Sequence, residues 1–126
     1  MPERAHAWDA GLDIKSRTKK LITSFGSAIF DTGVHVEIPE GYVGFVKSKS
    51  GMMVRDGITT DGTIDAGYTG PIKVKLFNNH SYAFSVKPGQ KIAQLVIVPC
   101  ETPEVIEVKK ITGGARGDNG FGSTGK

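Results

Sequence analysis

The glycine-rich end of the chain, residues 112–126, combines side chains that suit a phosphorylated ligand. Arg116 carries a planar guanidinium that matches phosphate oxygens, and Ser123 and Thr124 supply hydroxyl donors. Phe121 is the aromatic residue of this segment and offers a flat face on which a nucleobase can stack. These residue types predict a segment that covers a bound nucleotide.

The same segment has little with which to pack. Its glycines, Gly122 among them, leave backbone N–H groups free to approach an anion closely, but they bury almost no apolar surface. Such a segment cannot offset the entropy of its own ordering. We therefore expect a domain at 1–111 followed by a flexible tail at 112–126.

The elements that must position these side chains are short β-type runs separated by turn residues. Runs rich in Val, Ile and aromatic residues predict strands at 34–38, 42–47, 71–77 and 91–98. Turn signals separate them at 31–33, 39–41, 78–80 and 87–90. One short helix is expected near 51–55, ended by Asp56 and Gly57. The pattern indicates an all-β barrel or sandwich.

Composition narrows the possible functions. A chain of 126 residues with 38% hydrophobic residues fits one globular domain, and it has no apolar run long enough for a membrane span. The net charge is 16 − 13 = +3, and the basic residues are spread along the chain, so we expect a small polyanion and not a nucleic acid or a membrane as partner. The single Cys100 cannot form an intramolecular disulfide, which favours a reducing, cytoplasmic setting.

Five segments resemble, in order, the five motifs of the trimeric deoxyuridine triphosphate nucleotidohydrolases, the dUTPases. They are DAGLDI at 9–14, KSKSG at 47–51, GTIDAGYTG at 62–70, GQKIAQL at 89–95 and RGDNGFGSTG at 116–125. The third and fifth, correctly ordered and spaced, are the most specific. The resemblance implies a jelly-roll-like β-barrel that forms a homotrimer. It implies that each active site takes its first, second and fourth motifs from one chain, its third from a neighbour and its tail from the remaining chain.

The third motif would carry the chemistry. The resemblance implies hydrolysis of dUTP to dUMP and pyrophosphate by attack of water on the α-phosphorus, with Asp65 as the base. Tyr68 would pack against the deoxyribose and leave no room for a 2′-hydroxyl. The main chain at Thr63 and Ile64 would read uracil, and Lys73 would line the same pocket.

The second and fourth motifs would hold the phosphates. Ser50 would hydrogen-bond near the scissile bridge, Gly51 would allow close backbone approach, and Gln94 would lie near the α-phosphate. Lys49 and Lys91 stand where arginine is usual in the family. Lysine keeps the positive charge but loses the bidentate fork.

A triphosphate substrate implies Mg²⁺, and Asp13 of the first motif would hold one of the waters on that ion. The loop before the third motif is shorter than the family pattern and lacks an asparagine near the base. Thr60 or Asp61 is expected to replace it in part, or the backbone alone reads the base.

Two alternatives stay open. A dCTP deaminase shares the fold and parts of the second and third motifs. A regulatory module that captures a partner protein, with nucleotide as a switch, uses the same fold in some phage relatives. The complete set of catalytic motifs in this chain favours the diphosphatase.

Overall fold

The computed structural model describes residues 1–125; Lys126, the last residue of the predicted tail, lies outside the described residues. Along the chain the elements are β1 Gly11–Lys15, β2 Lys20–Ile22, β3 Ser27–Asp31, β4 Tyr42–Lys47, α1 Ser50–Asp56, β5 Ile58–Thr59, β6 Asp61–Ile64, β7 Lys73–Asn78, β8 Phe84–Val86 and β9 Lys91–Pro99. The strand-dominated chain confirms the predicted all-β class.

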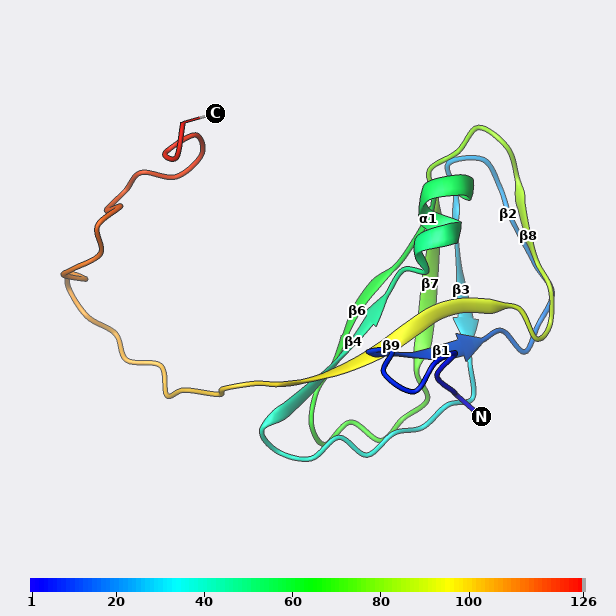
Figure 1. The fold of residues 1–126 in the computed structure, drawn as a ribbon, viewed down its shortest axis with the longest axis horizontal. Coiled ribbons are helices and arrows are strands. Elements are labelled where there is room, and N and C mark those ends of the chain that lie inside the picture. Colours follow the sequence, from blue (N-terminus) through cyan, green and yellow to red (C-terminus); the bar gives the residue numbers. More distant parts are fainter. Residues whose placement is uncertain (126) are drawn as a thin grey trace.

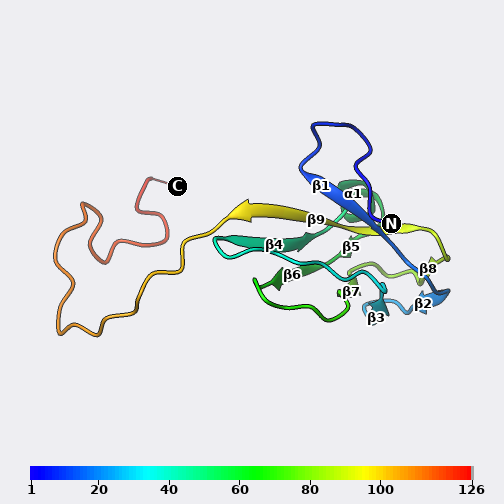
Figure 2. The same cartoon turned by 90° about the horizontal axis from the view of Figure 1, so that it is seen from below.

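The strands form antiparallel sheets around one core. The largest sheet has the order β1-β9-β4-β6, and smaller sheets have the orders β3-β7-β5 and β2-β8. Figure 2 shows β9 and β4 on one side of the barrel and β3 and β7 on the other. Alternate residues of β7 are exposed and buried, so Val74 and Leu76 face the core while Lys73 faces outward. The strand therefore has one buried and one solvated face.

Three of the four predicted strands and the helix are present. The runs 42–47, 71–77 and 91–98 correspond to β4, β7 and β9, and the expected helix near 51–55 is α1. The helix ends at Gly57, whose φ of 68° lets its N–H bond back to the carbonyl oxygens of Met52 and Met53.

The run 34–38 is not a strand in the described chain, so that prediction was wrong. Its burial alternates as a strand's would, with Ile38 buried and Val34 and Val36 packed partly against the core. The carbonyl of Val34 accepts a hydrogen bond from the N–H of Ile72 at 2.8 Å, but within residues 1–125 no strand pairs along the segment. An alternating apolar pattern predicts that one face of a segment is buried, but it does not predict whether another strand pairs with that segment.

Beyond β9 the chain leaves the barrel. Residues 101–125 are exposed, and Figure 1 shows them leading away from the other elements. The first part of this arm carries the exposed apolar side chains of Val105, Ile106 and Ile111. Within residues 1–125, no helix has the length and apolar character needed to cross a membrane.

Candidate functional site

The β6–β7 connection, residues 65–72, joins two different sheets and brings most of the predicted third-motif residues around one cavity. The cavity has a volume of about 230 Å³ and is lined by Thr63, Ile64, Asp65, Tyr68, Pro71 and Lys73. Lys73 reaches it from the start of β7, and the other predicted residues come from β6 and the turn that follows. Five residues chosen from sequence therefore share one site.

A tight turn projects the predicted base. The N–H of Tyr68 donates to the carbonyl of Asp65 at 3.2 Å, and Gly67 adopts a φ of 88°, which favours glycine at this place in the turn. Asp65 itself is exposed. The carboxylate thus lies in the turn directly after β6, accessible to water and to a ligand in the cavity.

The ring of Tyr68 is fixed by residues of the same β6–β7 connection. Its hydroxyl donates to the carbonyl of Pro71 at 2.8 Å, and a Cβ at Gly70 would lie only 2.6 Å from that hydroxyl oxygen. The ring therefore occupies space that only a glycine at position 70 leaves free. Sequence reasoning included Gly70 in the motif without finding this role, which no local pattern signals.

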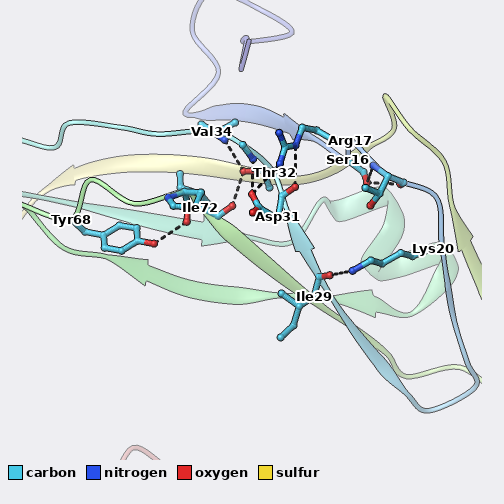
Figure 3. A network of polar contacts seen from close by, with 12 residues as sticks. Ser16, Arg17, Lys20, Ile29, Asp31, Thr32, Val34, Tyr68 and Ile72 are labelled. Atoms are coloured by element: carbon cyan, nitrogen blue, oxygen red, sulfur yellow. Dashed lines mark hydrogen bonds and ion pairs between the residues drawn. The ribbon is translucent and has the colours of Figure 1, made fainter.

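A buried threonine anchors the end of the β6–β7 connection, just before β7 begins. Thr32 donates its hydroxyl hydrogen to the carbonyl of Ile72 at 2.6 Å, and its oxygen accepts from the N–H of Val34 at 3.1 Å. Figure 3 shows these bonds beside Tyr68 and links them to Asp31 and Arg17 on the other side. Thr32 therefore ties the loop after β3 to the chain that enters β7.

Strand β6 offers its backbone to the cavity. It pairs with β4 on one side, with Thr63 opposite Phe45 and Ile64 opposite Gly44, and it is the edge of its sheet within the described chain. The side chain of Ile64 is buried in the core. An edge strand leaves alternate N–H and C=O groups unpaired, so main-chain groups of β6 are available to a base here, besides the polar side chains that line the cavity.

A second group of predicted residues meets at Asp13. Its carboxylate is 2% exposed, and Lys91 Nζ lies 2.8 Å from Oδ2 while Lys49 Nζ contacts Oδ1. Burial acts to raise the pKa of Asp13, but the hydrogen bonds from the two ammonium groups outweigh it and hold this pKa below its ordinary value of 3.8. The same contact raises the pKa of Lys91. Asp13 is therefore a carboxylate neutralised by two lysines.

The predicted contact between Asp13 and a metal-bound water stays a prediction. Both carboxylate oxygens lie near ammonium groups, but the buried Oδ2 has no hydrogen-bond partner in the described chain and keeps lone pairs for a further donor. Within residues 1–125, no group of three or more His, Cys, Asp or Glu side chains is placed to hold a metal ion.

Gln94 lies next to this cluster. It is opposite Asp13 in the β1–β9 pair, and its Nε2 donates to the carbonyl of Ser48 at 3.0 Å. A Cβ at Gly11 would lie 2.0 Å from the Gln94 side-chain oxygen, so Gly11 is needed to leave room for that amide. Ser50 and Gly51 begin α1 and are exposed, with no atom within 4 Å of where a Gly51 Cβ would lie.

Neither predicted substitute for the missing asparagine lines the cavity at the β6–β7 connection. Thr60 is buried, and its N–H bonds to the Ser48 hydroxyl at 2.9 Å. Asp61 accepts from Lys47 at 3.2 Å. Of the two expectations for base reading, the arrangement favours the backbone.

The two halves of the site lie apart within one chain. Strand β6 runs antiparallel to β4, from Asp61 opposite the end of β4 toward the start of β4. Asp65 follows Asp61 by four residues, which is about 13 Å at 3.3 Å per residue. Ser48 bonds to Thr60 past the other end of β4, and Ser50 lies beyond it. The predicted base and the predicted phosphate-binding serine therefore lie toward opposite ends of β4 within one chain.

The predicted tail residues are also separate from both halves. Arg116 donates to the carbonyl of Gly120 at 3.1 Å and contacts the hydroxyl of Ser123, while Phe121, Gly122 and Thr124 are exposed. Figure 1 shows this segment away from the barrel. Two predicted ligand contacts, Arg116 and Ser123, therefore meet each other in the chain.

The fold and the candidate site are those expected of an all-β nucleotide phosphohydrolase. The dUTPase family model matches residues 1–125. The chain is 42% identical over 129 residues to the deoxyuridine 5′-triphosphate nucleotidohydrolase of Clostridium tetani, covering 100% of this chain and 89% of that protein. It is 41% identical to the Oryza sativa enzyme of the same name over 126 residues, covering 99% of this chain and 74% of that protein. The chain belongs to the dUTPase family.

Solved structures of dUTPases resemble this chain over most of its length. The dUTPase of Staphylococcus bacteriophage 80alpha, with dUPNHPP, superposes with a TM-score of 0.93 at 35% identity and covers 100% of this chain and 92% of its own. A variant of the phage phi11 dUTPase, described with a structural Mg(II) ion, matches with a TM-score of 0.83 at 34% identity, covering 90% of this chain and 92% of its own.

Proposed function

We propose that this protein hydrolyses dUTP to dUMP and pyrophosphate. The observation that carries the proposal is the cavity at the β6–β7 connection, where Asp65, Tyr68 and the edge of β6 converge. Its base, sugar and catalytic functions come from neighbouring positions of one turn. Family membership supports the substrate, because the relatives that match 100% and 99% of this chain are named deoxyuridine 5′-triphosphate nucleotidohydrolase.

The chemistry is a direct attack of water on the α-phosphorus. The exposed carboxylate of Asp65 orients the water and takes its proton, and pyrophosphate leaves from the opposite side. Lys49 and Lys91, with donors left after pairing to Asp13, neutralise charge on the leaving group, and Ser50 donates near the bridging oxygen. No covalent intermediate is required.

Specificity comes from shape and from the main chain. Tyr68, held by Pro71 and accommodated by Gly70, closes the place of a 2′-hydroxyl. The free edge of β6 at Thr63 and Ile64 pairs with uracil and rejects cytosine, whose exocyclic amine reverses the pattern of donor and acceptor.

The separation of the two halves supports a shared active site in a homotrimer. Asp65 and its cavity from one chain would face Ser50, Lys49 and Gln94 of another, and Arg116 to Thr124 of a tail would close over the ligand. The substrate would enter as its Mg²⁺ complex, with the ion held by phosphates and water. We place the activity in the cytoplasm.

The test is pyrophosphate release from dUTP, dCTP, dTTP and UTP with Mg²⁺, on protein whose mass in solution is measured in the same preparation. Release from dUTP alone by a particle of three chains is the expected result. Ammonia release from dCTP would replace the diphosphatase by a deaminase, and a folded trimer that cleaves none of the four would refute it.

A second candidate function rests on the phage relatives. Structures of the 80alpha dUTPase are described as belonging to enzymes that control transfer of virulence genes by a G protein-like mechanism. For this chain, nucleotide-switched capture of a regulatory protein would require a partner that co-purifies and is released by a non-hydrolysable dUTP analogue. Failure to retain any partner in the nucleotide-free state would remove this candidate.

A further inference from the structure

The cluster at Asp13 is built from three separate parts of the chain. Asp13 lies in β1, Lys49 precedes α1 and Lys91 begins β9. The backbone N–H of Asp13 also donates to the carbonyl of Glu3 at 2.8 Å, so the N-terminal segment covers one side of β1 and β9 covers the other. This burial from both sides fixes the carboxylate.

Each carboxylate oxygen is assigned to one lysine. Lys91 Nζ is 2.8 Å from Oδ2, and Lys49 contacts Oδ1. The neighbouring carboxylate of Glu3 does not compete, because it pairs with Lys15 at 2.8 Å. The two lysines are thus held side by side on one buried anion, and the cluster keeps a net charge of one positive unit.

The lysines remain partly accessible while their anchor is not. Their side chains are 29% and 42% exposed for Lys49 and Lys91, against 2% for Asp13. An ammonium group has three donors, so each lysine keeps donors for a ligand on its exposed side. A lysine on a flexible stem gains direction from such an anchor, which an arginine fork would not need.

We propose that Asp13 is a positioning residue that holds Lys49 and Lys91 together as a paired receptor for the phosphates of the nucleotide. This inference rests on the proposed function, since it assigns how that site holds its substrate. This role differs from the predicted contact to a metal-bound water, and the tests below distinguish the two. Asp13 acts through the lysines and touches no reacting atom.

The test measures binding without turnover and without metal. Inorganic pyrophosphate is titrated calorimetrically in EDTA into the wild type, Asp13→Asn, Lys91→Met and the double variant. We expect each single variant to bind about tenfold more weakly, and the double variant to bind no more than about twofold more weakly than Lys91→Met alone. Glu3→Gln, which removes the neighbouring carboxylate but leaves the pairs intact, is the control and should bind as the wild type does.

A second readout separates positioning from a metal role. The Mg²⁺ concentration for half-maximal dUTP turnover should be the same in Asp13→Asn as in the wild type. Unchanged pyrophosphate binding in EDTA, together with a tenfold higher Mg²⁺ requirement, would overturn the proposal in favour of a metal-water contact. Tighter pyrophosphate binding would overturn it by showing that Asp13 competes with phosphate.

The wild type provides a test that does not depend on the folding of a variant. The carboxyl carbon of Asp13 should shift in the NMR spectrum when pyrophosphate binds in EDTA, and a later addition of Mg²⁺ should cause no further shift. The reverse order of responses would refute the inference. Because these measurements use pyrophosphate and no hydrolysis, they remain informative if dUTP proves not to be the substrate.

Discussion

Asp65 occupies a position where sequence and structure support the same role. Its turn is fixed by Gly67 and by the Tyr68 N–H, and its carboxylate is exposed beside the cavity. Nothing in the core depends on its side chain. A substitution here therefore tests chemistry separately from folding.

Asp65→Asn keeps the shape and removes the proton acceptor. We expect hydrolysis of dUTP to fall by at least about a thousandfold, while the affinity for a non-hydrolysable dUTP analogue stays within about threefold. Single-turnover kinetics and calorimetry on the same preparation measure the two quantities. Turnover near the wild-type rate would remove Asp65 from the mechanism.

Gly70 provides a test of the sugar pocket that leaves Tyr68 in place. Gly70→Ala puts a methyl group 2.6 Å from the Tyr68 hydroxyl, so the ring must move while the backbone stays unstrained. We expect the preference for dUTP over UTP, as a ratio of kcat/KM values, to fall about tenfold. Gly62→Ala on β6, where the nearest atom lies at 3.6 Å, is the matched control and should keep the ratio.

The ion pairs of Asp13 make stability depend on acidity. A carboxyl whose pKa is lowered on folding contributes stability above its ordinary pKa of 3.8, and this contribution is lost as the pH falls through the lower folded-state value. We expect the wild type to be more stable than Asp13→Asn in urea at pH 7, and the difference to shrink below pH 4. A difference that is the same at pH 7 and pH 3 would contradict the ion-pair account.

The sequence motifs identified individual site residues but not the contacts between residues that are distant along the chain. The motifs located Asp65, Tyr68, Lys73 and Gln94, because residue type and order are visible in a sequence. They did not place Lys49 and Lys91 on the same carboxylate, since that contact joins three elements that are distant along the chain. Gly11 was missed for the same reason, because its partner Gln94 lies on another strand.

At the scale of elements, the barrel depends on side chains that close its loops. Asn78 at the end of β7 is 2% exposed, and its Nδ2 donates to the carbonyls of Ile22, Thr23 and Tyr82. Its side-chain oxygen accepts from His80 N–H at 3.0 Å. This one amide joins the β2–β3 and β7–β8 connections.

Asn78→Ala should therefore destabilise the fold by about 2–4 kcal/mol, because buried carbonyl groups lose their donor. Asn79→Ala is the control: its amide bonds to Gly57 and Thr59 are exposed, and we expect a loss below about 1 kcal/mol. Urea denaturation of both variants measures the difference. Equal losses would show that the buried network is not special.

Strand prediction succeeded where apolar runs pair within the chain and failed at 34–38. Segments β4, β7 and β9 have both apolar patterning and antiparallel neighbours, whereas 34–38 has only the first. Pairing is a property of the tertiary arrangement, so a pattern along one segment cannot specify it.

In the proposed mechanism, a single chain does not hold a complete active site. Ser50 and Asp65 lie toward opposite ends of β4, and the arm after β9 exposes apolar side chains at Val105, Ile106 and Ile111. Other chains would supply both the missing half of each site and a surface for the arm.

Mixing two defective chains tests this sharing. Asp65→Asn and Ser50→Ala homotrimers should each be almost inactive. Unfolded together at equal amounts and refolded, they should recover about one quarter of wild-type activity, because each half of a site is intact with a probability of one half. A mixture that forms mixed trimers by mass spectrometry but stays inactive would show that each site belongs to one chain.

The buried side chain of Ile64 and the free edge of β6 affect how this protein can change over evolutionary time. All residues except proline carry the same amide, so under the proposed backbone readout, substitutions at Thr63 or Ile64 that preserve the strand would leave recognition of the base untouched. A preference for uracil read in this way would be protected from most point mutations, and relatives with different residues at these positions would share one specificity.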